Sequence, residues 1–136
     1  MIIPYTLLPS IYKGSVRLPL AKVILNYKKT HKITPVPISA LIDSGADVCF
    51  CNETIGAWLG IKFNKNKEGI FTTANKTTFK AKPEIITVHA YNKVYESKFF
   101  FTDTLPQHTP IILGQIGFFD HFKISFDYQG NEIIIN

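Results

Sequence analysis

Asp43 ends an apolar stretch and begins a polar one, which makes it the first candidate for chemistry in this sequence. Residues 39–42 are mostly apolar and lead directly into Asp43-Ser44-Gly45. A carboxylate at the end of such a strand lies at the boundary between the apolar core and a tight loop. Gly45 lets the backbone turn and lets another chain approach closely, and the Ser44 hydroxyl can hold the loop by hydrogen bonding.

Two such loops facing one another would place two carboxylates within hydrogen-bonding distance. Like charges at that separation do not both ionise, so the pair shares one proton. The charged carboxylate can then activate water while the neutral one protonates a carbonyl or a leaving amine. Neither Asp103 nor Asp120 is followed by Ser/Thr-Gly, so a second catalytic aspartate is not expected within this chain. On its own, Asp-Ser-Gly is also an ordinary turn.

Other reactive residues are scattered. No metal ion or organic cofactor is expected, because the four histidines lack ligand spacing and no Gly-rich phosphate loop or nucleophile elbow occurs. Cys49 and Cys51 point the same way in an extended chain, which favours two small buried thiols in a reducing compartment. A redox-sensitive thiol pair near the active site is the alternative. The histidines are His31, His89, His108 and His121.

The composition is that of a folded domain. An apolar fraction of 46% in 136 residues is enough for a core, and nothing divides the chain, so residues 1–136 are expected to form one domain. The net charge of +5 comes from scattered lysines without interleaved aromatic residues, so no nucleic-acid partner is predicted. The sequence shows no signal peptide and no apolar run near the ~18 residues of a membrane span, which predicts a cytoplasmic protein without membrane contact.

Short β segments separated by Pro, Gly and Asn predict an all-β fold. The clearest hairpin joins two long strands through a turn at Asn92-Lys93. Pro35 and Pro37 place the start of one strand at a sheet edge. Alternation puts Phe99 and Phe101 in the core, and Trp58 is expected there too. The predicted strands are 20–27, 34–42, 84–91, 94–102, 123–127 and 132–135.

Helix is scarce in the predicted fold. Asn52 is typical of an N-cap for a helix over 53–59, with Gly60 ending it. A second short helix is predicted over 115–121. Many short strands with one or two helical turns favour a partly closed barrel or a sandwich.

Four elements in order make the chain resemble the retropepsins, the single-domain aspartic proteases of retroviruses with relatives in bacteria and eukaryotes. They are the apolar strand running into Asp43-Ser44-Gly45-Ala46-Asp47, the short helix ending in Leu59-Gly60-Ile61, a hairpin over 69–82 around Ala74-Asn75-Lys76, and Ile111-Ile112-Leu113-Gly114. Together they cover about residues 20–127.

The resemblance implies a retropepsin-like partly closed barrel with a flap hairpin, acting on polypeptides as a homodimer. Asp43 would be the catalytic aspartate of an endopeptidase. Ser44, Gly45 and Ala46 would form the active-site loop. The residues implied to contact the extended substrate are Asp47, Val48, Ile70, Phe71 and Phe79, the last four of which favour apolar side chains beside the cut.

The sequence departs from the viral pattern in three places. Many viral members have Arg after the apolar-apolar-Gly strand, where this chain has Gln115. The flap lacks a glycine-rich tip, which predicts a different hinge. The hairpin at 123–136 extends past the position of the viral C-terminus, so interleaved termini are in question.

Two rival functions stand beside the protease. One is an inactive peptide-binding or dimerisation module that keeps the fold, although its expected mark, a damaged Asp-Ser-Gly, is missing here. The other is a basic β domain that binds nucleic acid, which salt-dependent retention on DNA would favour.

Overall fold

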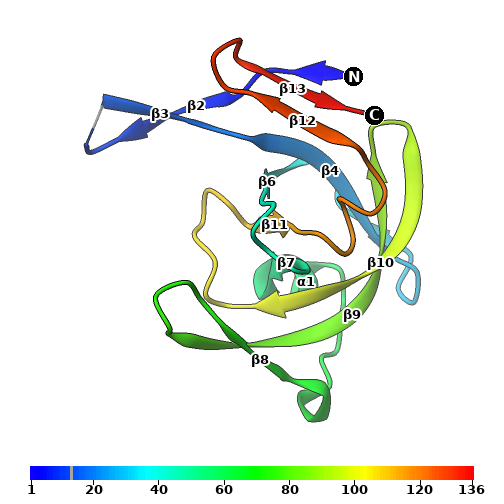
Figure 1. Cartoon of the computed structure of the whole chain (residues 1–136). Coiled ribbons are helices and arrows are strands. Elements are labelled where there is room, and N and C mark those ends of the chain that lie inside the picture. The colour runs from blue at the N-terminus through cyan, green and yellow to red at the C-terminus, as the bar shows by residue number, and fades with distance from the viewer. Residues whose placement is uncertain (13) are drawn as a thin grey trace.

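Strands make up most of the molecule (Figure 1). The computed structural model describes residues 1–12 and 14–136. Its helices are α1 (Glu53–Trp58) and the 3-10 helix η1 (Lys65–Lys67). Its strands are β1 (Ile2–Ile3), β2 (Thr6–Ser10), β3 (Gly14–Leu18), β4 (Leu20–Tyr27), β5 (Lys32–Ile33), β6 (Ile38–Ile42), β7 (Cys49–Asn52), β8 (Gly69–Thr72), β9 (Thr78–Ala90), β10 (Lys93–Thr102), β11 (Ile111–Leu113), β12 (Ile124–Asp127) and β13 (Glu132–Ile135).

Six strands close into a barrel. The main sheet has the order β5-β4-β6-β11-β7-β10-β9-β8, and a further pairing of β4 with β9 joins it into a ring. The β6–β11 and β7–β10 pairs are parallel, while the other pairs are antiparallel. The all-β barrel expected from the sequence is confirmed, and the β4–β9 pairing closes it. Because the barrel is closed, each of its strands has a paired neighbour on both sides. These strands are β4, β6, β7, β9, β10 and β11.

The barrel interior holds the hydrophobic core. Alternate residues of β4 are buried, and Phe99 and Phe101 of β10 are fully buried while Glu96 and Lys98 point outward. Cys49 and Cys51 are also fully buried free thiols, as predicted. Further core residues include Val23, Leu25, Ala40, Ile42, Ile86, Val88, Ile111, Leu113, Phe118, Ile133 and Ile135.

The helix α1 follows its predicted signals, with one exception. The Asn52 side chain accepts a hydrogen bond from the Thr54 backbone N–H (2.8 Å), and Gly60 has a φ of +79° after the helix. The prediction that Trp58 is a core residue is wrong, because its exposed fraction is 50%. The helix turns Gly56 to the core instead, where a Cβ would lie 2.6 Å from Phe63 and 3.0 Å from Phe101.

The second predicted helix is absent within the described residues. Residues 115–121 form a series of turns in which Asp120 N–H bonds the Gln115 carbonyl (3.0 Å). A helix cannot run here because Gly117 has a φ of +110°. In addition, the Ile116 N–H donates to the Asp47 carbonyl (2.9 Å). This bond joins residue 116 to the segment after Asp43 and not to a preceding turn of a helix.

Strand boundaries agree to within one residue around the turn of the long hairpin, but β9 starts at Thr78, six residues before the predicted start, and agreement is also poorer after β4. The β9–β10 turn is Tyr91-Asn92, one residue before the predicted pair, with φ of +48° and +67°. These positive values suit a two-residue hairpin turn. The strand predicted over 34–42 starts only at Ile38, after both prolines, while residues 32–33 form the separate edge strand β5.

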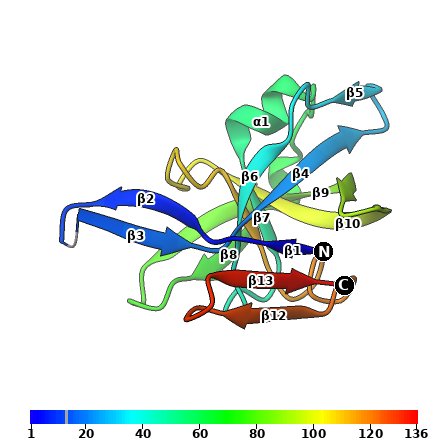
Figure 2. The same cartoon turned by 90° about the horizontal axis from the view of Figure 1, so that it is seen from above.

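Both chain termini lie in a second, smaller sheet. Its order is β1-β13-β12, so the predicted C-terminal hairpin also pairs with the N-terminal strand. A separate hairpin, β2–β3, extends away from the barrel (Figures 1 and 2) and was not predicted. None of the helices in the described part of the chain is both long and apolar enough to cross a membrane.

Candidate active site

Asp43 follows the last residue of β6 and is held by the turn after it. Its backbone N–H donates to the Leu113 carbonyl of β11 (2.9 Å). The Gly45 N–H donates to Asp43 Oδ1 (2.9 Å), and the Ala46 N–H donates to the Asp43 carbonyl (3.2 Å). The side chain is half-buried. The local sequence therefore fixes one carboxylate oxygen and leaves the group at the rim between core and solvent.

The Asp43 loop rests on the end of β11. Beyond this strand, the Gln115 N–H donates to the Ala46 carbonyl (2.8 Å). Gly114 lies so close to the loop that a Cβ there would be 2.2 Å from the Val48 carbonyl oxygen and 2.6 Å from that of Ala46. The Gly114 N–H also donates to Cys49 Sγ (3.3 Å). Glycine is thus required at this position by close packing of backbone on backbone.

Gln115 braces the loop in the place of the viral arginine. Its side-chain Nε2 donates to the Ser44 carbonyl oxygen (2.7 Å). Asp47 is exposed, and none of the ion pairs among the described residues involves it. A neutral amide-to-carbonyl bond thus stands where the resemblance implies a charged pair.

A cleft of about 700 Å³ opens over Asp43, which is within the usual range for ligand sites. Its floor is the Asp43 loop and its roof is the flap, formed by β8, the start of β9 and the turn between them. Among the predicted site residues, Ser44 and Ile70 do not line it. The lining residues are Asp43, Gly45, Ala46, Asp47, Val48, Phe50, Phe71, Thr72, Thr73, Ala74, Thr77, Thr78, Phe79, Thr104, Leu105 and Ile112.

Ile70 lies on the outer face of the flap. Its exposed fraction is 72%, whereas its neighbour Phe71 is half-buried and lines the cleft. Successive residues of a strand point to opposite faces, so Ile70 and Phe71 cannot both face the cleft. Phe79 pairs directly with Phe71 and shares its face. The expectation that Ile70 lines the cleft is therefore wrong, because side chains alternate along β8 and Phe71 is the one that faces the cleft.

Four phenylalanines attach the flap to the barrel wall. Phe71 of the flap lies 5.0 Å, centroid to centroid, from both Phe50 of β7 and Phe100 of β10. Phe79 lies 5.4 Å from Phe50 and 5.6 Å from Phe71. The sequence reasoning missed Phe50 as a site residue. The signal was available, because Phe50 stands between two buried cysteines and so must point to the other face of β7.

The flap turn is tied by polar side chains. Asn75 Oδ1 accepts from Thr77 Oγ1 (2.8 Å) and from the Thr77 N–H (3.3 Å), and Thr73 Oγ1 also bonds it. The Thr73 N–H donates to the Thr77 carbonyl (2.8 Å), and Lys76 takes a φ of +67°. An asparagine-centred turn thus replaces the glycine-rich tip of viral flaps.

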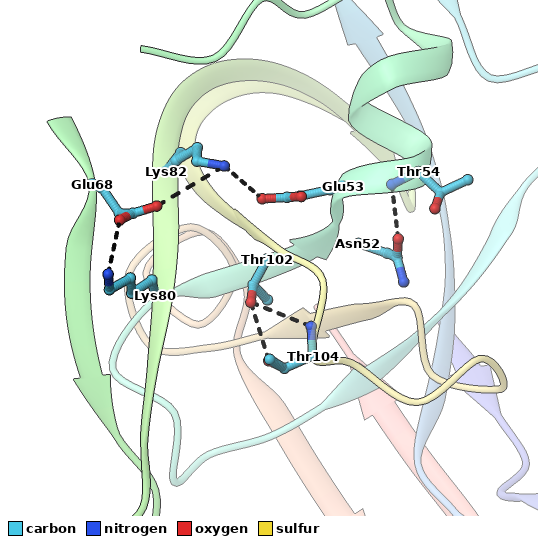
Figure 3. Close-up of polar contacts among 8 residues, drawn as sticks. All are labelled: Asn52, Glu53, Thr54, Glu68, Lys80, Lys82, Thr102 and Thr104. Atoms are coloured by element: carbon cyan, nitrogen blue, oxygen red, sulfur yellow. Dashed lines mark hydrogen bonds and ion pairs between the residues drawn. The ribbon is translucent and has the colours of Figure 1, made fainter. Parts of the chain in front are cut away.

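Figure 3 shows polar contacts that join β9 to α1 and that hold the segment after β10. Thr104 lines the cleft, and its hydroxyl oxygen lies 3.1 Å from the hydroxyl oxygen of Thr102. Lys82 of β9 bonds Glu53 at the start of α1 (3.0 Å) and lies 3.9 Å from Glu68. The hydrogen bond to Glu53 raises the pKa of Lys82 above its usual value of 10.5. In residues 1–12 and 14–136, no cluster of three or more His, Cys, Asp or Glu is placed to hold a metal.

Comparisons with solved structures find the same arrangement of strands elsewhere. A retropepsin-like aspartic protease from Rickettsia conorii superposes with a TM-score of 0.59 and 17% identity, over 98% of this chain and 99% of that chain. The retroviral protease-like domain of Ddi1 from Leishmania major gives 0.55 and 15%, over 89% and 90%. The EIAV protease in complex with an inhibitor gives 0.55 and 17%, over 72% and 82%. No protein-family model matches the sequence, and no curated protein matches it.

Proposed function

We propose that this chain, whose fold is that of the retropepsin-like aspartic proteases, is an aspartic endopeptidase that works as a homodimer. The observation that carries the proposal is the placement of Asp43. Its half-buried carboxylate lies on the floor of a 700 Å³ cleft, beneath a flap, with one oxygen already bonded by Gly45 N–H. Fold alone does not establish activity, so the proposal rests on this site.

The reaction needs two carboxylates, and each chain supplies one Asp-Ser-Gly. Asp43 from each subunit would meet its counterpart across a two-fold axis and share one proton. The charged carboxylate would take a proton from water as it attacks the scissile carbonyl. The neutral one would protonate the carbonyl oxygen, and the carboxyl that took the proton from water would then give it to the leaving amine. As the C–N bond breaks, a hydroxyl of the gem-diol intermediate would return its proton to the other carboxylate. The apparent pKa values of such a pair belong to both groups together.

The substrate would be an extended polypeptide beside the flap strands. The walls of the cleft combine the apolar side chains of Val48, Phe71, Phe79 and Ile112 with threonines of the flap turn. An extended peptide bonds through its backbone and places alternate side chains in such pockets. We therefore expect apolar or aromatic side chains on both sides of the cleaved bond.

Profiling with a peptide library tests this function. The wild-type protein should cleave peptides beside apolar residues, and Asp43→Asn, which keeps the shape of the side chain, should cleave none while unfolding at the same urea concentration. Charged residues dominating beside the cut would contradict the specificity. Tight peptide binding without cleavage by the wild type would instead identify the inactive peptide-binding module.

A further inference from the structure

The β2–β3 hairpin exposes large apolar side chains. Its strands pair from Thr6↔Leu18 to Ser10↔Gly14, and most of its residues are exposed or half-exposed. The exposed fractions are 93% for Ile11, 89% for Tyr12 and 65% for Leu7. A two-stranded hairpin is marginal in water by itself, and contiguous exposed apolar surface marks interaction sites. The hairpin therefore needs a partner for its outer half.

The base of the hairpin is fixed to the molecule, so its direction is defined. Arg17 of β3 donates to the Tyr128 carbonyl (3.0 Å), and its guanidinium lies 5.2 Å from the centre of the Tyr128 ring. Tyr5 packs edge-on against the same ring at 5.4 Å. A hollow of about 240 Å³ beside the hairpin is lined by its residues Leu8, Pro9, Val16 and Leu18 and by His108. The body of the chain thus anchors the base and leaves Ile11 and Tyr12 exposed.

The hairpin points to the side where the cleft opens. In both Figure 1 and Figure 2 it projects to the same side as the β8–β9 turn and the 103–110 loop. Residues of that turn and of that loop line the cleft over Asp43. A second copy that brings its own Asp43 to this cleft must approach from the same side. The exposed tip therefore lies where the second copy is needed.

The terminal strands are already paired within the chain. Strand β13 has β1 on one side and β12 on the other, and the Met1 amino group donates to the Ile135 carbonyl (2.9 Å). Both edges of β13 are therefore used, and it cannot interleave with strands of a second copy. Only the outer edges of β1 and β12 stay open in this sheet. A dimer of this chain therefore forms through one of these edges or through another element, and not through interleaved terminal strands.

We propose that the β2–β3 hairpin is a dimerisation arm, whose tip residues Ile11 and Tyr12 are buried against a second copy of this chain. This inference rests on the proposed function, since the shared active site supplies the need for the second copy. In a two-fold dimer each hairpin makes the same contact with its partner, so the assembly closes at two chains. Large apolar and aromatic tips are the kind of residue that dominates interface energy.

Sedimentation of charge variants tests the arm. Tyr12→Asp should weaken the dimer by about tenfold or more in dissociation constant. Val36→Asp is the matched control, because Val36 is an equally apolar exposed residue on the segment between β5 and β6 (62% exposed). The control should dimerise like the wild type. Equal dimerisation of Tyr12→Asp and Val36→Asp would overturn the arm, as would a wild-type protein that stays monomeric at every concentration.

A third variant separates the arm from the terminal sheet. Phe126 of the edge strand β12 is 43% exposed, and Phe126→Asp places a charge on that edge. We expect this variant to dimerise like the wild type. If Phe126→Asp dissociates the dimer while Tyr12→Asp leaves it intact, the interface lies at the β12 edge and the β2–β3 hairpin is not a dimerisation arm.

Activity assays keep the arm and the protease function distinguishable. Cleavage by Tyr12→Asp should be weak at low protein concentration and recover as concentration rises, because its cleft is intact. If the wild type dimerises through Tyr12 but never cleaves a peptide, the hairpin is a dimerisation arm and the proposed protease function is wrong. If the wild type cleaves peptides and Tyr12→Asp dimerises normally, the protease function stands and the arm fails.

Discussion

At the scale of single residues, Gly114 has the tightest steric restriction beside the active-site loop. Any side chain here would meet the carbonyl oxygens of Val48 and Ala46, which cannot move without displacing the loop that carries Asp43. We expect Gly114→Ala to lower the free energy of unfolding by about 1–3 kcal/mol or more and to abolish cleavage. Urea unfolding and a peptidase assay measure both effects.

Gly69→Ala is a suitable control for the unfolding experiment. A Cβ at Gly69 would meet the edge of the Phe71 ring at 3.3 Å, and its nearest backbone contact would be the Ala81 carbonyl at 3.9 Å. The alanine there should cost clearly less stability than the one at Gly114. Equal losses in the two variants would show that the loop does not depend on backbone contact at Gly114.

The buried thiol of Cys49 leads to a second prediction. Burial raises the pKa of this thiol to about 12, so almost no thiolate exists at neutral pH. We expect neither Cys49 nor Cys51 to react with a disulfide reagent in the native protein, and both to react in urea. Since the folded pKa lies above the ordinary thiol value of 9.0, the thiol stabilises the fold below about pH 9 and loses that contribution as pH rises toward 12. Rapid native-state labelling would instead favour a redox-sensitive pair.

At the scale of elements, the flap turn depends on Asn75. Its carboxamide oxygen accepts from two groups of Thr77, so Asn75→Ala removes bonds worth about 1 kcal/mol each. The turn should become more mobile, and KM should rise more than kcat falls. Backbone NMR order parameters and steady-state kinetics measure the two effects.

The matched control for the flap is Asn64→Ala. Asn64 makes a comparable bond, accepting from the Asn66 N–H at 3.0 Å, but it lies at η1, outside the cleft. Its removal should leave KM unchanged. An equal rise in KM for both variants would mean that general loosening, and not the flap turn, controls substrate binding.

The ion pair between β9 and α1 gives a pH-dependent prediction. Lys82 is mostly buried and bonds Glu53, whereas Lys80 is exposed and lies 3.9 Å from Glu68. Lys82→Met should lower the free energy of unfolding by about 0.2–1 kcal/mol, and Lys80→Met by less. Because the folded-state pKa of Lys82 is raised, its contribution is complete below about pH 10.5 and is lost as pH rises through the folded value. A wild-type advantage that persists unchanged well above that pH would contradict the pairing.

Local patterns predicted four of the six barrel strands, which are β4, β6, β9 and β10. The alternation in β10, the turn at Asn92 and the cap at Asn52 each follow from a few neighbouring residues. The β2–β3 hairpin escaped prediction because its base is fixed by Arg17 and Tyr128, which are 111 residues apart in sequence. Neither partner has a neighbouring pattern that indicates the other.

The same distinction holds in the site. Asp43 was singled out by its apolar strand and glycine turn, and the four ordered elements that resemble the retropepsins made it the predicted catalytic residue. Alternation along each strand separates Phe50 from the buried cysteines and Ile70 from Phe71, but which of the two faces meets the cleft depends on the register between distant strands. Gln115 was identified as a departure from the viral pattern, but its bond to the Ser44 carbonyl needed the three-dimensional structure.

At the scale of the whole molecule, the proposed mechanism requires two chains for one active site. One Asp-Ser-Gly per chain supplies a single carboxylate, and one carboxylate cannot act as both base and acid in this mechanism. Asp43→Asn should keep the fold and the dimer while removing one member of the pair. Mixed dimers of wild-type and Asp43→Asn chains should therefore be inactive.

Mixing equal amounts of the two proteins, with subunit exchange verified by mass-tagged chains, tests this requirement most directly. Random pairing gives about a quarter wild-type dimers. If both carboxylates are needed, activity should fall to about a quarter of that of an all-wild-type sample at the same total protein. Activity of about half, as independent subunits would give, would contradict the shared active site.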